Sequence, residues 1–293
     1  MPRVNLGELN VHYQQAGAGP DLILIHGLFC NLAFWYLTVV PQLAEIFRVT
    51  VYDLRGHGLS ARKPAGYRAV DLADDLRLLL EHLGIQSAHF VGHSFGGAVA
   101  LAFAIRQPEC IRSLTLADAW VPSLQPWPGG ASRWASLRQR LRRRGIELES
   151  SLEVPKVLHG FIEELVSLNE ASAPGEEASL DAIQSLLSNA NSMALRRWNQ
   201  LVGRTRAGQE FGDPAGIAAR EIEGFRRPAL AVFGARSRYL PTLHGLRERL
   251  EDCQVQIVPD AGHYFPIVNR VAFTRAVSDF AFQQEGKVAK LAG

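Results

Sequence analysis

Cysteine is scarce in this sequence. The chain of 293 residues holds three cysteines, Cys30, Cys110 and Cys253, which are odd in number and far apart. A disulfide framework would need an even number, and a cysteine metal site would need close spacing. We therefore expect free, mostly buried thiols.

Long apolar runs and an excess of charge of one sign are also missing. No apolar run reaches the roughly 18 residues that suggest a membrane span, and residues 1–5 lack the basic and apolar segments of a secretory signal. The formal net charge is only +2, which is too small to indicate nucleic acid or a membrane surface as a partner. These absences predict a cytoplasmic protein whose partner is a small molecule.

Cofactor motifs are absent as well. The sequence contains no glycine-rich phosphate loop, no cluster of metal ligands and no dinucleotide-binding fingerprint. We therefore expect neither a bound metal nor any other cofactor.

The apolar patterns that are present indicate an α/β protein. A hairpin pattern surrounds Gly7, and residues 69–83 carry leucines at helical spacing up to Gly84. Short runs typical of buried strands lie at residues 22–25, 48–52, 88–91, 114–117, 229–233 and 255–258. This alternation predicts a mostly parallel central sheet flanked by helices, with ligands bound beyond the carboxyl ends of the strands.

A stretch of about a hundred residues without a convincing strand separates Ala117 from Ala229. It opens with a proline cluster at residues 122–128, and its helical patterns lie near residues 132–143, 152–168, 180–190 and 193–201. We predict a core domain of residues 1–121 and 225–293 with an inserted helical cap over residues 122–224.

One turn carries a nucleophile motif. Ser94 lies in Gly92-His93-Ser94-Phe95-Gly96, between an apolar strand pattern and a helical pattern, which is the context that a G-x-S-x-G nucleophile requires. Such a turn strains the serine, exposes its hydroxyl and directs the first amides of the helix at a developing oxyanion. The motif alone could be a chance turn, but its context favours a nucleophile.

Three further motifs accompany this turn. They are His26-Gly27, the loop from Tyr52 to Ser60 with Arg55-Gly56-His57-Gly58 at its centre, and Gly262-His263. With these motifs the chain resembles the α/β-hydrolase superfamily, specifically its cap-bearing branch of esterases, C–C hydrolases and epoxide-hydrolase-like proteins. Because the dehalogenases and epoxide hydrolases of that family carry an aspartate as nucleophile, Ser94 argues against those activities.

The resemblance implies a base and an oxyanion hole. His263 follows the strand pattern at residues 255–258, in a loop that could bring its imidazole to Ser94, and an unperturbed pKa of about 6.5 suits a general base. The family's geometry implies that the backbone N–H groups of Leu28 and Phe95 form the oxyanion hole. His57 is expected to be structural.

The acid of the implied triad is missing from its usual place. Family members carry it in a Gly-x-x-Asp turn after the penultimate strand, whereas here the turn ends in Ser237. A serine cannot supply the charge that stabilises an imidazolium. We expect Asp118, directly after the strand pattern at residues 114–117, to replace it, as in some lipases and one dehalogenase group. An aspartate at this place could instead only cap the outgoing turn.

Other carboxylates are weaker candidates. Asp213 lies at the predicted cap exit, Asp260 is too close to His263 in sequence, and Glu210 is expected on a solvated face. Without a catalytic Asp118, the chain would be a Ser–His dyad of reduced rate or a noncatalytic descendant of the family.

Aromatic residues indicate an apolar substrate pocket. Phe29 and Tyr264 flank the oxyanion and base motifs, and Trp120 lies at the entry to the cap, so we expect these side chains to bind substrate. Trp134 and Trp198 could equally pack the cap against the core. The arginines at residues 138–144 could attract an anionic substrate, although a solvated helix face is the simpler explanation.

Taken together, the residues predict a serine hydrolase that cleaves a carboxylic ester or related carbonyl compound with a hydrophobic acyl or aryl group, through an acyl-enzyme on Ser94. Two alternatives remain open. One is C–C bond hydrolysis, lyase chemistry or acyl transfer on the same fold, and the other is a ligand-binding protein without turnover. A homodimer is compatible with the sequence.

Overall fold

The computed structural model describes residues 2–126 and 193–291. In this part of the chain one sheet has the strand order β1-β2-β4-β3-β5-β6-β7-β8. Its strands are β1 (Arg3–Leu6), β2 (Leu9–Ala16), β3 (Asp21–Ile25), β4 (Arg48–Tyr52), β5 (Ala88–His93), β6 (Ile111–Ala117), β7 (Ala229–Gly234) and β8 (Cys253–Val258). β1, β2 and β4 pair in antiparallel fashion, and the pairs from β4 to β8 are parallel.

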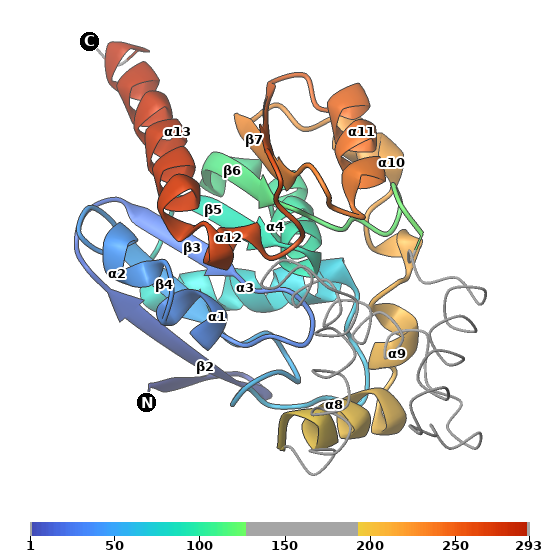
Figure 1. Ribbon diagram of the computed structural model, residues 1–293. Helices are drawn as coiled ribbons and strands as arrows, with labels where there is room; N and C mark the ends of the chain where they lie inside the picture. Colours follow the sequence, from blue (N-terminus) through green and yellow to red (C-terminus); the bar gives the residue numbers. More distant parts are fainter. Residues whose placement is uncertain (1, 127–192, 292–293) are drawn as a thin grey trace.

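Helices cover both faces of the sheet (Figure 1). On one face α3 (Ala69–Leu83) packs against α4 (Phe95–Arg106), with α10 (Ala219–Glu223) and α11 (Leu240–Arg249) beside them. The other face carries α1 (Ala33–Tyr36), α2 (Val40–Leu43), α12 (Phe265–Val268) and α13 (Arg270–Leu291). Each face therefore has its own apolar core, which is the arrangement predicted from the alternating patterns.

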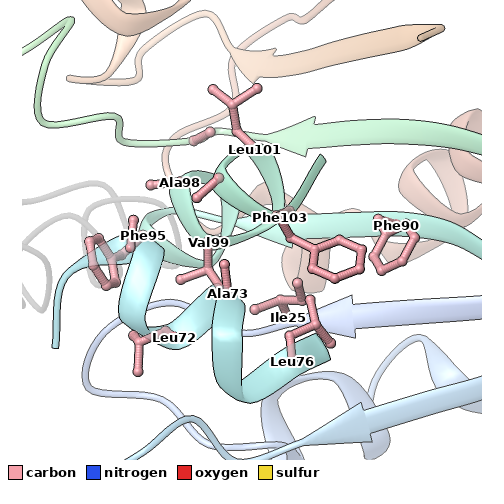
Figure 2. Close-up of a cluster of buried hydrophobic side chains, with 14 of the residues drawn as sticks. Ile25, Leu72, Ala73, Leu76, Phe90, Phe95, Ala98, Val99, Leu101 and Phe103 are labelled. Carbon is pink, nitrogen blue, oxygen red and sulfur yellow. The ribbon is translucent and has the colours of Figure 1, made fainter. Parts of the chain in front are cut away.

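The pattern at residues 69–83 predicted α3 correctly. Leu72, Leu76 and Leu79 are buried, and Gly84 ends the helix in the left-handed conformation with a φ of 67°. In Figure 2 the buried side of α3 faces α4, whose Val99 and Phe103 fill the space above the sheet. This packing fixes α4, and with it the position of the residue that precedes the helix.

The last strand differs from its prediction. The apolar run at residues 255–258 predicted a buried strand, but β8 is the edge of the sheet, and Val255 and Ile257 are exposed. β5, by contrast, lies between two neighbours and is buried at every position. Local composition was similar in the two strands, and it is the strand order that decides burial.

Part of the predicted cap lies outside the described residues. This concerns the helices expected at residues 132–143, 152–168 and 180–190, together with Trp134 and the arginines near residue 140. The described part contains α8 (Met193–Arg204), α9 (Ala207–Glu210) and a 3-10 turn (Pro214–Gly216); another such turn (Pro108–Cys110) follows α4. Trp198 of α8 is buried, stacks on Phe211 and lies 3.8 Å from the ring of Phe29, which fits the packing alternative. The domain boundaries stay a prediction.

Two predictions about exposure were wrong. Glu210 is buried rather than solvated, because its Oε2 accepts the backbone N–H groups of Gly66 and Tyr67 at 2.8 and 2.9 Å. The three cysteines are free, as expected, but each is partly exposed rather than buried. Among the helices that the structure describes, none combines the length and apolarity needed to cross a membrane.

Candidate active site

Ser94 stands at a strained turn between β5 and α4. Its φ of 54° and ψ of −125° are unfavourable for a residue with a side chain. The neighbouring glycines allow the turn to form. A Cβ on Gly96 would collide with the carbonyl oxygens of Ile25 and His26, and one on Gly92 would collide with the backbone of Gly96. The surrounding fold therefore holds Ser94 in the strained conformation expected of such a turn. The residue is buried, at 5% exposure, rather than exposed as the motif predicted.

Asp118 and His263 form a buried pair. The Nδ1–H of His263 donates to Oδ2 of Asp118 at 2.7 Å, and the side chains are 2% and 0% exposed. Asp118 directly follows β6 with a φ of 45°, and its N–H donates to the carbonyl oxygen of Val232 on β7 at 2.8 Å. The carboxylate is thus fixed between two strand ends, where it can orient and stabilise a protonated imidazole.

Backbone contacts bring this pair to the serine turn. The N–H of Ser94 donates to the carbonyl oxygen of Ala117, next to Asp118, at 3.1 Å. Nε2–H of His93 donates to the carbonyl oxygen of His263 at 3.0 Å, and the two rings lie 4.5 Å apart. The three predicted residues, Ser94, Asp118 and His263, therefore gather at the carboxyl ends of β5, β6 and β8.

Ser237 lies beside the acid instead of replacing it. Its hydroxyl donates to the same Oδ2 that binds His263, and Oδ1 of Asp118 accepts the N–H of Gly234 at 2.9 Å. The turn in which the acid was expected therefore contributes two donors to a carboxylate from the neighbouring strand. The turn carries no carboxylate of its own, yet two of its groups bind the carboxylate of Asp118.

The expected oxyanion turn packs directly on the nucleophile. A Cβ on Gly27 would lie 2.8 Å from Cβ of Ser94, so only glycine fits there without a shift. His26 fixes the peptide that follows: it accepts the N–H of Leu54 at Nε2, 3.1 Å away, and so donates from Nδ1 to the carbonyl oxygen of Gly27 at 2.7 Å. Because C=O and N–H point in opposite directions across a trans peptide, this contact turns the N–H of Leu28 away from His26.

The second predicted oxyanion donor is the first residue of α4. Phe95 is completely buried, and its N–H is among the amides at a helix start that have no partner within the helix. The positive end of the helix dipole adds to its attraction for a developing negative charge. The roles of Leu28 and Phe95 stay predictions, but both amides lie next to residues that contact Ser94.

Burial keeps the nearby histidines neutral. Burial, with His26 as a second cause, lowers the pKa of His57 to about 3, and burial likewise lowers the pKa of His26. Nδ1 of His57 donates to the carbonyl oxygen of Arg55 at 3.0 Å. His57 is therefore structural, as expected, and it adds no positive charge beside the oxyanion turn.

The predicted substrate-binding residues surround the site at different depths. Phe29 follows the oxyanion turn and packs on Trp198 with a ring distance of 3.8 Å, and Tyr264 lies 5.0 Å from the ring of His263. Trp120 is buried, and its backbone N–H donates to the carbonyl oxygen of Ser94 at 3.0 Å. The backbone of Trp120 thus supports the turn that carries Ser94.

The sequence reasoning missed two residues of this site. No role was predicted for His93, yet its ring joins the turn of Ser94 to the loop of His263. Ser237 was considered only a missing acid. A polar side chain next to the nucleophile, and a hydroxyl rather than an apolar residue at the acid position, were the available signals. The weaker acid candidates lie elsewhere: Asp213 caps a 3-10 turn, and Asp260 pairs with Arg236 at the surface.

The described residues contain no group of three or more histidine, cysteine, aspartate or glutamate side chains placed to hold a metal ion. The chemistry that the site can perform with its own side chains is nucleophilic attack by Ser94, with proton transfer through His263.

Comparison with known proteins identifies the family. A family model described as alpha/beta hydrolase fold matches residues 20–269. The chain is 28% identical to 2-hydroxy-6-oxo-2,4-heptadienoate hydrolase of Pseudomonas putida, over 93% of this chain and 92% of that protein. It is 41% identical to RutD of Stutzerimonas stutzeri, a protein named for carbamate hydrolysis, but only over 38% of this chain and 43% of that protein.

A solved structure extends the likeness to the whole fold. Est816, described as an enzyme that degrades N-acyl homoserine lactones, superimposes with a TM-score of 0.72 at 19% identity, and the match covers 95% of this chain and all of that one. At this identity the likeness concerns the fold alone.

Proposed function

We propose, from the premise that this chain belongs to the α/β-hydrolase family, that it is a serine hydrolase of carboxylic esters or related carbonyl compounds with a hydrophobic acyl or aryl group. The observation that carries this proposal is the buried hydrogen bond between Asp118 and His263, 2.7 Å long, beside the strained Ser94. The family match indicates a hydrolase, and the specificity for esters is the proposal.

In the proposed mechanism His263 takes the proton of Ser94 as the hydroxyl attacks the carbonyl carbon. The N–H groups of Leu28 and Phe95 hold the oxyanion, and Asp118 stabilises the imidazolium. His263 then gives its proton to the leaving alcohol, which departs and leaves an acyl-enzyme. Water, deprotonated by His263, attacks this acyl group, and Ser94 regains its proton when the acid leaves.

Aromatic side chains support an apolar acyl group. Phe29 and Trp198 pack together beside the oxyanion turn, and Tyr264 lies against the base. Rings of this kind exclude water and bind apolar carbon chains or other rings. We therefore propose that Phe29 and Tyr264 bind the substrate. Trp120 is included in the proposed pocket through its packing on Phe95, the residue after Ser94.

The test is labelling of Ser94 by a fluorophosphonate, followed by intact mass. We expect the wild type to gain one adduct at a rate far above that of Ser94→Ala, which should gain none. Hydrolysis of aryl esters with acyl chains of increasing length should be fastest for apolar chains. A folded wild type that neither labels nor hydrolyses any ester would favour the ligand-binding alternative.

C–C bond hydrolysis is the second candidate. It is favoured by the match over nearly the whole chain to an enzyme named 2-hydroxy-6-oxo-2,4-heptadienoate hydrolase. The same serine and histidine could serve attack on a ketone, with a carbanion rather than an alkoxide as the leaving group. Presenting such a dienoate beside the ester panel separates the two: a kcat/KM for the dienoate well above that for every ester would assign C–C cleavage.

A further inference from the structure

Ser237 contacts the carboxylate of Asp118 directly. Its hydroxyl donates to Oδ2 of Asp118, the oxygen that also accepts Nδ1–H of His263. Its side chain is buried, at 7% exposure for the residue. A buried hydroxyl bound to a carboxylate forms a charge-assisted hydrogen bond, which is stronger than one between neutral groups.

A second contact completes the hydrogen bonding of the Ser237 hydroxyl. The N–H of Tyr239 donates to the Ser237 Oγ at 3.0 Å, and the N–H of Ser237 donates to the carbonyl oxygen of Gly234 at 3.0 Å. Because an ionised carboxylate can only accept, the hydroxyl hydrogen points to Asp118 while a lone pair accepts from Tyr239. Oδ1 of Asp118 is held in turn by the N–H of Gly234.

We infer that Ser237 is a positioning residue for the base: it holds the Asp118 carboxylate in the orientation that receives His263, and it withdraws part of the negative charge from Oδ2. The inference rests on the proposed function. The hydrogen bonds of Ser237 join it to Asp118, Tyr239 and Gly234, so we expect it to act on His263 through Asp118. Its effect should therefore appear in kcat and in the pH profile rather than in KM.

The first test is Ser237→Ala. We expect kcat to fall about tenfold, because the Asp118 carboxylate is no longer held in the orientation that receives Nδ1–H of His263, with little change in KM. The remaining carboxylate carries a more concentrated charge and stabilises protonated His263 better, so the acidic limb of the kcat/KM profile should move up by about 0.5 pH unit. In the part of the chain that the structure describes, Asp118, His93, Tyr239 and Tyr264 contact His263, and the variant leaves all four in place.

Two companion variants separate positioning from general loss of packing. Ser237→Thr keeps the hydroxyl and should restore both kcat and the profile. Ser113→Ala is the matched control, since Ser113 is a buried serine whose hydroxyl contacts His89 at 2.8 Å, away from the site. It should leave the profile unchanged. An unshifted profile and a wild-type kcat in Ser237→Ala would overturn the inference.

The second test moves the carboxylate from position 118 to position 237. Asp118→Asn alone should lose most activity. Combined with Ser237→Asp, it puts a carboxylate at position 237, on a side chain one atom longer than that of serine. The serine hydroxyl already contacts Oδ2 of Asp118, the oxygen that accepts the hydrogen bond from His263. We expect the double variant to regain at least about tenfold in kcat over Asp118→Asn. Equal rates in the single and double variants, both folded by circular dichroism, would contradict the placement of Ser237.

Failure of the proposed function would look different. If wild-type Ser94 neither labels nor turns over any carbonyl substrate, the proposed function is wrong, and the inference falls with it. If the wild type is active but Ser237→Ala behaves like Ser113→Ala, the proposed function stands and only the role of Ser237 is removed.

Discussion

Two buried aspartate–histidine pairs in this molecule have the same length and different surroundings. Asp118 binds His263 and Asp53 binds His12, both at 2.7 Å, and all four side chains are almost fully buried. Oδ1 of Asp53 accepts the N–H of Leu32 and its Oδ2 that of Leu59, so this carboxylate ties two loops together. A buried histidine–carboxylate pair is therefore no sign of catalysis by itself.

The neighbours of each pair decide its role. Asp118 has a φ of 45° at a strand end, and Ala117 before it binds the N–H of Ser94. The pair of His12 and Asp53 lies between β2 and the loop after β4. One pair lies beside the strained turn of Ser94, and the other lies among backbone N–H groups that Asp53 accepts. Substitutions should separate a catalytic pair from a structural one.

The largest effect is expected from Asp118→Asn. An asparagine keeps the shape but cannot stabilise the imidazolium, and it favours the wrong tautomer of His263, so kcat should fall by about 10³- to 10⁴-fold. The melting temperature should change little. Steady-state kinetics and the labelling rate of Ser94 measure the first effect, and calorimetry the second. A kcat within about tenfold of the wild type would remove Asp118 from the mechanism.

Asp53→Asn should show the opposite balance. The amide of an asparagine points a donor at one of the N–H groups that the carboxylate accepts, so the free energy of unfolding should fall by about 3 kcal/mol. The activity of the folded fraction should fall much less than in Asp118→Asn. Urea unfolding followed by kinetics at low temperature tests both statements. The comparison breaks if the folded Asp53→Asn protein loses as much kcat as Asp118→Asn does.

The sequence predicted the elements of this molecule better than their neighbours in space. α3 followed from the spacing of its leucines, and Asp118 followed from its place after a strand, because both signals are local. The exposure of β8 depends on its place at the sheet edge, which no local pattern records. Strand order is a property of the whole chain.

The two polar surprises have the same cause. Glu210 binds Gly66 across 144 positions of sequence, and Ser237 binds Asp118 across 119. In both cases a polar residue that looked idle in its own segment satisfies groups of a distant one, as buried polar groups must. Residue type and local motif pointed to Ser94 and His263 as candidates, whereas partners of this kind require the structure.

Acid should act on the structural loop. His57 belongs to the segment held by Asp53, and burial lowers its pKa to about 3. The unfolded chain takes up this proton near pH 6.5 whereas the folded chain does not, so stability is lost as the pH falls from about 6.5 towards about 3, by about 2 kcal/mol at pH 5. When the free energy of unfolding is measured with urea between pH 7 and pH 4, it should change less steeply with pH in His57→Asn than in the wild type.

The control for this prediction is an exposed histidine. His244 lies on the solvent side of α11, so His244→Asn should leave the pH slope of the wild type unchanged. An equal slope in wild type and His57→Asn would mean that other groups cause the acid sensitivity. The structural half of the comparison would then lose its pH signature.

The smallest expected effect comes from adding one methyl group to the predicted oxyanion turn. A Cβ on Gly27 would lie 2.8 Å from that of Ser94, so Gly27→Ala should shift the oxyanion turn and lower kcat/KM about tenfold, less than the loss of a whole oxyanion donor. Gly203→Ala is the control, because a Cβ there meets nothing within 4 Å on helix α8, and it should stabilise the fold by up to about 1 kcal/mol. Kinetics and thermal unfolding of both variants decide the matter. Gly27→Ala could instead lower stability and leave activity unchanged. The turn would then serve only to pack the core, and the oxyanion donors would have to come from another segment.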